Sequence, residues 1–119
     1  MNWHRIDTCI SFNDPESRFE FRTVDAAVEL SFRDWRDRLI RFEFESVSHF
    51  RVSHLRELSD LPGPDFYAIQ DSPVIHGLRE SHALGRTEPA NHYVVAHNGD
   101  EWCEVVAESY QITIDETPN

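Results

Sequence analysis

The sequence contains no lysine, and all 11 of its strongly basic residues are arginine. Both residue types solvate surfaces, so we attribute this bias to a GC-rich genome rather than to selection for bidentate contacts. Basic residues are also outnumbered by 22 acidic ones, giving a net charge of −11. Such a field repels phosphate backbones, and the arginines of residues 33–41 are interleaved with acids. The charge therefore predicts no nucleic-acid binding and favours encounter with a basic protein.

Cysteine is scarce as well. Cys9 and Cys103 are far apart in the sequence and form no Cys-x-x-Cys pair. They are typical of reduced, packing cysteines in a cytoplasmic protein, although one disulfide would also satisfy the sequence. No stretch approaches the roughly 20 apolar residues of a membrane-spanning helix, and the first residues lack a secretion signal. We expect a cytoplasmic protein with no membrane contact.

What the sequence does contain is period-two alternation of apolar and polar residues, which indicates β-strands with one buried face. We expect residues 1–119 to form a single domain that is mainly β, an antiparallel sandwich or partly open barrel. The alternating stretches are residues 5–12, 18–22, 28–33, 40–45, 48–52, 66–71 and 110–114.

Turn residues divide these strands. Residues 26–46 are predicted to form one hairpin, with a bulge near Ser46-Val47 before the chain continues. Ser72-Pro73 has the form of an N-cap followed by proline at the first helical position, and predicts a short helix ending near His82. A second helix over residues 55–61 would make the fold a two-layer α+β arrangement instead.

The pair Asn98-Gly99 lies between two β-rich stretches and predicts a hairpin over residues 92–107, because a type I′ turn needs φ > 0 at both central residues. A two-residue loop pairs Val95 with Trp102. One face then consists mainly of small apolar residues and is the expected core side: His92, Val94, Ala96, Cys103, Val105 and Ala107. The other face is mixed and is the expected outer side: Tyr93, Val95, His97, Trp102, Glu104 and Val106.

This outer face and one polar turn supply the predicted binding residues. An outward face with aromatic side chains is typical of association surfaces. We therefore predict Tyr93, Val95 and Trp102 as binding residues. Trp35 lies between arginine and aspartate in the turn over residues 33–37, where it is either a binding anchor or folds back on its own hairpin. We expect these four residues to bind a protein partner or a second copy of the chain, as in a dimer.

Several short stretches of the chain resemble a loose group of small bacterial proteins of unknown function. They are Val47-Ser-His-Phe-Arg-Val52, Phe66-Tyr-Ala-Ile-Gln-Asp-Ser72, His92-Tyr-Val-Val95 and Glu104-Val-Val-Ala107. The resemblance covers roughly residues 45–115. It implies a small β-rich fold and brings no activity, cofactor or catalytic residue. More distantly, the chain resembles immunity proteins of bacterial toxin systems.

The seven histidines invite a metal hypothesis, but their spacing disfavours it. His92 and His97 are five residues apart and point to opposite faces of a strand, and His76 and His82 diverge around a helix. Cys103 and His92 share the expected core face, where an apolar setting beside glutamates suits packing rather than nucleophilic catalysis. The acidic pairs are expected on solvated faces. We therefore predict no catalytic residue, no metal ligand and no cofactor.

The function favoured by these features is a non-enzymatic interaction domain, self-associating or binding a basic partner, with an immunity-type inhibitor as one form. The alternative is a small enzyme or ligand-binding protein whose polar groups come from His76, His82, His92 and nearby acids. A pocket converging on those side chains would favour the alternative.

Overall fold

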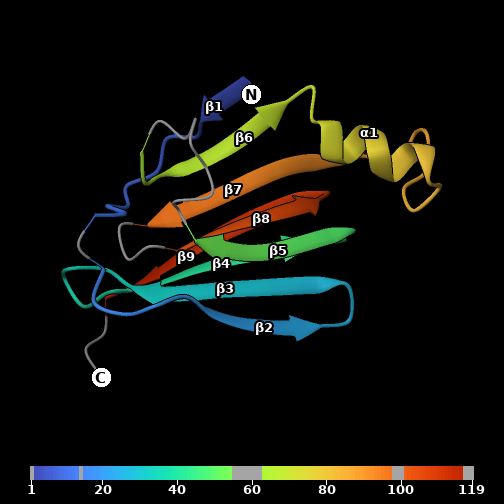
Figure 1. The fold of residues 1–119 in the computed structure, drawn as a ribbon. Helices are drawn as coiled ribbons and strands as arrows, with labels where there is room; N and C mark the ends of the chain where they lie inside the picture. The colour runs from blue at the N-terminus through green and yellow to red at the C-terminus, as the bar shows by residue number, and fades with distance from the viewer. Residues whose placement is uncertain (1, 14, 55–62, 98–100, 117–119) are drawn as a thin grey trace.

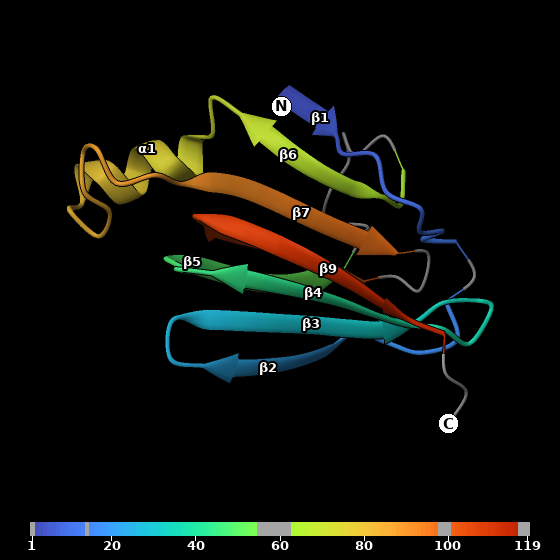
Figure 2. The same ribbon diagram turned by 180° about the vertical axis from the view of Figure 1, so that it is seen from behind.

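The computed structural model describes residues 2–13, 15–54, 63–97 and 101–116. Two antiparallel sheets pack face to face with one short helix, α1 (Pro73–Glu80), at an end, so the chain is a β-sandwich as predicted. Figure 1 views the five-stranded sheet, in the order β1 (Asn2–Arg5), β6 (Phe66–Gln70), β7 (Asn91–His97), β8 (Glu101–Ala107) and β5 (His49–His54). Figure 2 views the four-stranded sheet, in the order β2 (Glu20–Val24), β3 (Ala27–Arg33), β4 (Leu39–Glu45) and β9 (Ser109–Asp115).

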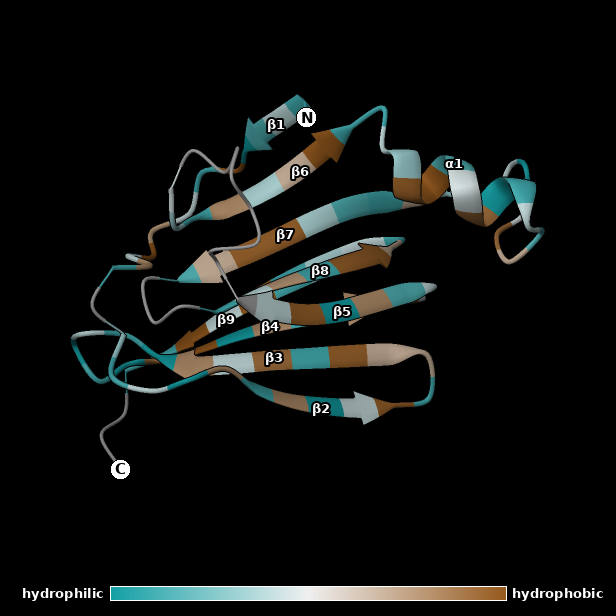
Figure 3. Cartoon of the chain, in the orientation of Figure 1, coloured by the Kyte–Doolittle hydropathy of each residue, from teal (hydrophilic) through white to brown (hydrophobic). Residues whose placement is uncertain are grey.

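The four-stranded sheet has one dry face and one wet face. Buried and part-exposed residues alternate along β3 and β4, which form the predicted hairpin. Figure 3 shows the same alternation as bands of brown and teal along β3. The inward aromatic rings meet those of the other sheet, with ring centroids 5.0 Å apart for Phe42 and Phe66 and 5.7 Å apart for Phe44 and Tyr93. This aromatic layer is the main core.

The chain changes sheets where the sequence predicted a bulge. Ser46 has a left-handed backbone, with φ of 54°. On its far side, the Val47 N–H donates to Ala26 beside the four-stranded sheet, and the Ser48 N–H donates to Val106 in the five-stranded sheet. The alternation that continues from β4 into β5 therefore belongs to two different sheets, joined by a corner.

The first predicted strand is wrong in its position. Strand β1 covers Asn2–Arg5 and pairs with β6, whereas the structure has no strand over residues 6–12. Their apolar side chains still turn inward. Phe12 is buried and packs against Phe32 and Phe42 with centroids 5.9 and 6.2 Å away. Alternation therefore identified the core residues without identifying the strand.

The register of the β7–β8 hairpin differs by one residue from the prediction. Val95 pairs with Cys103, Ala96 with Trp102 and His97 with Glu101, so three residues rather than two lie between the paired strands. The predicted turn at Asn98-Gly99 itself lies outside the described residues. A slip of one residue exchanges the two faces of a strand for every side chain on it. Tyr93, Val95, Cys103, Val105 and Ala107 therefore face the main core, whereas His92, Val94, Ala96, Trp102, Glu104 and Val106 face the opposite side.

Helix α1 forms as its sequence predicts but ends two residues early. Ser72 is its N-cap, and the Ile75 N–H donates to Ser72 Oγ at 3.2 Å. Pro73 occupies the first turn, and the backbone turns left-handed at His82, with φ of 63°. The second helix expected over residues 55–61 lies outside the described residues. No helix in the described ranges is both long and apolar enough to span a membrane.

Candidate functional site

The structure separates the four predicted binding residues. Tyr93 and Val95 lie in the core between the sheets, with 6% and 0% of their surface exposed. Trp102 is on the other face of the hairpin but is only 2% exposed, in a second cluster with Tyr67. The prediction of one outer aromatic face is therefore wrong, because the hairpin loop has one residue more than assumed.

Trp35 is half-exposed at the tip of the β3–β4 hairpin, with the Arg36 guanidinium 4.8 Å from its ring centroid. The turn beneath it is held together by the side chain of Asp34. Asp34 is fully buried, and its carboxylate accepts from the backbone N–H groups of Arg36 and Arg38 and from the Arg38 side chain at 2.8 Å. Trp35 is thus the one predicted binding residue that the fold leaves accessible.

The register that buries Trp102 also assembles a chain of hydrogen-bonded polar side chains. Ser72 Oγ lies 2.7 Å from His92 Nδ1, and His92 Nε2 lies 3.2 Å from Glu104 Oε2. The other carboxylate oxygen of Glu104 lies 2.9 Å from His49 Nε2. These four residues, which we call the Ser72–His49 chain, run from the N-cap of α1 across β7 and β8 to β5. Ser72, His92 and Glu104 are buried.

The chemistry of Glu104 fixes the direction of these hydrogen bonds. The hydrogen bond from His92, and after it that from His49, lowers the pKa of Glu104 to about 2 in spite of its burial. An ionised carboxylate can only accept, so Nε2 of both imidazoles donates to it. In neutral His92, Nδ1 is then an acceptor, and the Ser72 hydroxyl donates to it. Each hydrogen bond of the Ser72–His49 chain thus joins a donor to an acceptor, as buried polar groups require.

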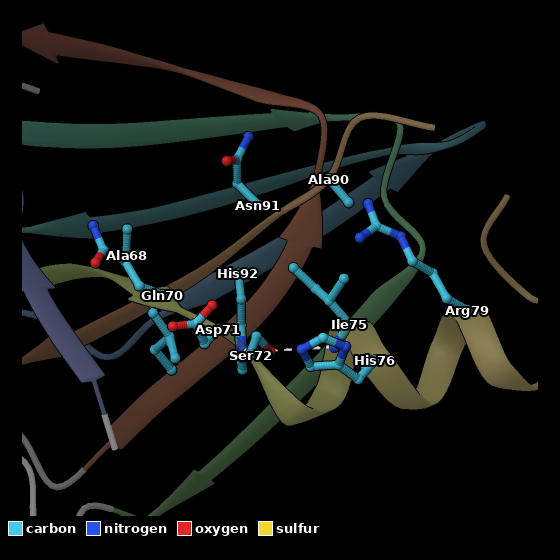
Figure 4. A pocket seen from close by; sticks show the side chains of 11 residues that line it. Ala68, Gln70, Asp71, Ser72, Ile75, His76, Arg79, Ala90, Asn91 and His92 are labelled. Atoms are coloured by element: carbon cyan, nitrogen blue, oxygen red, sulfur yellow. Dashed lines mark hydrogen bonds between the residues drawn. The ribbon is translucent and has the colours of Figure 1, made fainter. Parts of the chain in front are cut away.

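A cavity of about 520 Å³ opens beside one end of this chain, between α1 and the adjoining ends of β6 and β7. Ser72 and His92 line it together with His76 and Arg79 from α1 (Figure 4). Apolar side chains complete its walls: Ala68, Ile69, Ile75 and Ala90. Its volume is within the range of small-molecule sites.

Arg79 stands between this cavity and a second one of about 350 Å³, and both Arg79 and His76 line the two. The guanidinium Nη2 donates to the Glu88 carbonyl at 3.2 Å. Its Nε is buried and has no hydrogen-bond partner within the described part of the chain. An unsatisfied buried N–H beside a cavity is a group for which a bound water or ligand is expected.

Two other sequence predictions about histidine have opposite outcomes. His92 and His97 do point to opposite faces of β7. His76 and His82, expected to diverge, line the same second cavity because the helix ends before His82. Across the described ranges, no group of three or more histidine, cysteine, aspartate or glutamate residues is arranged to hold a metal ion.

Both cysteines are free. Cys103 lies in the core, where burial raises the pKa of its thiol, and Cys9 is exposed. The predicted sharing of one hairpin face by Cys103 and His92 is wrong in the observed register. A buried thiol held protonated is a packing group, as its apolar setting suggested.

Comparison of the chain with protein-family models, with curated proteins and with solved structures finds no match. The resemblance of residues 45–115 to small bacterial proteins therefore stays a prediction, and the site is interpreted from its geometry alone.

Only part of this site has a signal in the local sequence. The sequence predicts Ser72 only as an N-cap and Glu104 only as an outward acid. No pattern marks Arg79 or connects His49 with this site. Three residues between the strands place His92 and Glu104 on the same face of the hairpin. Glu104 pairs with Val94, which is two residues along β7 from His92. Nothing in the local sequence selects that loop length.

Proposed function

We propose that the protein binds a small organic ligand carrying a negative group in the cavity between α1, β6 and β7. The observation that carries this proposal is Arg79, which lines a cavity of about 520 Å³ and whose buried Nε has no hydrogen-bond partner among the residues that the structure describes. A guanidinium with a free N–H edge is suited to a carboxylate or phosphate oxygen. The meeting of His76 and His92 in this cavity also favours the ligand-binding alternative.

The charges around the cavity are unevenly placed. Asp71, the one carboxylate among its lining residues, precedes α1, whereas Arg79 is in the last turn of the helix. Arg79 is seven residues beyond the N-cap Ser72, a distance of about 10 Å along the helix at 1.5 Å per residue. Asp71 and Arg79 accordingly stand well apart in Figure 4. Among the described residues no carboxylate lines the Arg79 end of this cavity, and Glu80 lines the second cavity instead. Arg79 can therefore attract an anion within a protein of charge −11.

The test is a titration of the ¹⁵N-labelled protein with benzoate and, separately, with inorganic phosphate, followed by NMR. We expect amide shifts at α1 and at the start of β7. Arg79→Gln should weaken binding at least about tenfold, the loss of one charge-assisted hydrogen bond. Arg36→Gln, which removes an exposed arginine elsewhere, should leave affinity unchanged. Equal affinity in Arg79→Gln and wild type would reject the proposal.

A second candidate function is binding of a basic protein in the cytoplasm, as an immunity-type inhibitor would do, or association of two copies. Its support is the net charge of −11 and the half-exposed Trp35, a residue type common at the energetic centre of interfaces. Trp35→Ala should then weaken self-association in sedimentation, or binding to a basic protein toxin, without loss of folding. A wild-type chain that stays monomeric excludes the self-association form.

A further inference from the structure

Ser72 and His92 have the geometry of a nucleophile and its base at the wall of a cavity. The distance of 2.7 Å from Ser72 Oγ to His92 Nδ1 is that of a strong hydrogen bond, and both residues line the cavity. Glu104 holds the opposite ring nitrogen at 3.2 Å, as the acidic member of a catalytic triad does. In the serine proteases the serine is hydrogen-bonded to Nε2 of the histidine and the acid to Nδ1. Here the two nitrogens are reversed, since Ser72 is hydrogen-bonded to Nδ1 of His92 and Glu104 to Nε2.

We propose that Ser72 is a nucleophile for acyl transfer to water, with His92 as its general base and acid, and that the substrate is a small ester bearing a negative group. The substrate class rests on the proposed function, since it is Arg79 that selects an anionic ligand. Glu104 is a positioning residue, which acts by holding His92 in the tautomer that leaves Nδ1 free to accept a proton.

The reaction balances without any metal or redox partner. Ser72 Oγ forms a bond to the ester carbonyl carbon while its proton moves to His92 Nδ1. The C–O bond to the alcohol then breaks, and Nδ1 returns the proton to the leaving oxygen. A water molecule attacks the acyl-serine in the same way, giving the carboxylate, a proton and free Ser72. His92 Nε2–H stays bonded to Glu104 throughout.

The N-cap position of Ser72 supports this chemistry. The Ile75 N–H already donates to Ser72 Oγ, and the N-terminus of α1 carries partial positive charge. Both stabilise negative charge on Oγ as its proton leaves. One lone pair of Oγ remains for the ester carbon, because the hydroxyl proton faces His92 and one lone pair accepts from Ile75.

The experiment is labelling of the folded protein with a fluorophosphonate at pH 8, with peptide mass spectrometry to locate the adduct. We expect one adduct, on Ser72. Ser72→Asn keeps an N-cap oxygen but has no hydroxyl, and should fold and remain unlabelled. Ser81→Ala removes an exposed serine at the other end of α1 and should be labelled like wild type. No adduct on the folded wild type, or an adduct on another serine, overturns the proposal.

Hydrolysis of two probes tests the substrate class and the role of Glu104. 4-Acetoxybenzoate has a carboxylate that cannot reach its own ester, and it should be hydrolysed at least about tenfold faster than the neutral methyl 4-acetoxybenzoate. Arg79→Gln should abolish that preference. Glu104→Gln should lower kcat at least about tenfold and shift its pH profile, which loss of packing alone would not do. Binding of benzoate without ester turnover overturns this inference but leaves the proposed function standing. Turnover without a preference for the ester that carries the carboxylate overturns the substrate class.

Discussion

At the scale of single residues, the buried carboxylate of Asp34 stabilises the turn between β3 and β4. Its side chain has no exposed surface, and its carboxylate is held by hydrogen bonds and by an ion pair with Arg38 Nη2 at 2.7 Å. The hydrogen bond that the Arg38 side chain donates to Asp34 also raises the pKa of Arg38. Because a buried charge must be compensated, Asp34 and Arg38 act as a unit.

Asp34→Asn should destabilise the protein by at least about 2 kcal/mol, since breaking a buried ion pair typically costs about 3–5 kcal/mol and Arg38 retains Glu116 at 3.6 Å. Asp37→Asn is the matched control in the same turn. Asp37 is exposed, pairs with Arg33 at 3.5 Å, and should cost less than about 1 kcal/mol. Urea unfolding measures both. Equal losses would show that burial of Asp34 does not decide its contribution.

At the scale of elements, the β7–β8 hairpin is buried on both faces. Its inward face belongs to the aromatic core between the sheets, and its outward face carries the second cluster and the Ser72–His49 chain. The buried pattern along β7 and β8 is consequently continuous rather than alternating. The hairpin holds both the main core and the candidate site, so its register matters to stability and to function alike.

Trp102→Ala should cost about 3–5 kcal/mol, the usual loss for truncation of a large buried aromatic residue. Trp35→Ala, at the exposed tip of the other hairpin, should change stability by less than about 1 kcal/mol. Urea unfolding measured by far-UV circular dichroism compares the two. A small effect at Trp102 would contradict the observed register, because the two-residue loop predicted an outer position for it.

At the scale of the whole molecule, two buried groups should control stability in acid. His97 has no exposed surface, and its ring centroid lies 4.0 Å from that of Phe19. Burial lowers its pKa from 6.5, with a smaller contribution in the same direction from Arg18 and an opposing one from Glu101. The pKa of Glu104 is lowered too, but for the opposite reason. Hydrogen bonds stabilise the charged form of Glu104, whereas burial of His97 favours its neutral form.

The two shifts act in successive pH ranges. Below about 6.5 the unfolded chain takes up a proton at His97 before the folded one does, so stability falls as the pH falls toward the folded pKa. The contribution of Glu104 is complete above 4.5 and is lost as the pH falls from 4.5 toward about 2. His97→Leu should flatten the first decline and Glu104→Gln the second, in urea unfolding between pH 7 and pH 2.5. An unchanged slope in either variant would contradict its assignment.

Much of the fold was predictable because its signals are local. Alternation in residues 28–33 and 40–45 gave β3 and β4, and Ser72-Pro73 gave the start of α1. The switch between sheets at Ser46 was visible only as a bulge, since a local pattern does not state which sheet a strand joins. The candidate site was not predictable, because its members are 12, 20 and 55 residues apart in the hydrogen bonds that join them.

The sequence by itself determined most of the strands after the first, where α1 begins and that most charge lies outside, because backbone geometry and capping are set by neighbouring residues. The tertiary structure alone decided which face of β7 and β8 is which. One additional loop residue exchanges the faces, buries Trp102, and brings Glu104 between His92 and His49. Which face of a strand a side chain occupies depends on the pairing register. The candidate site depends on that register as well.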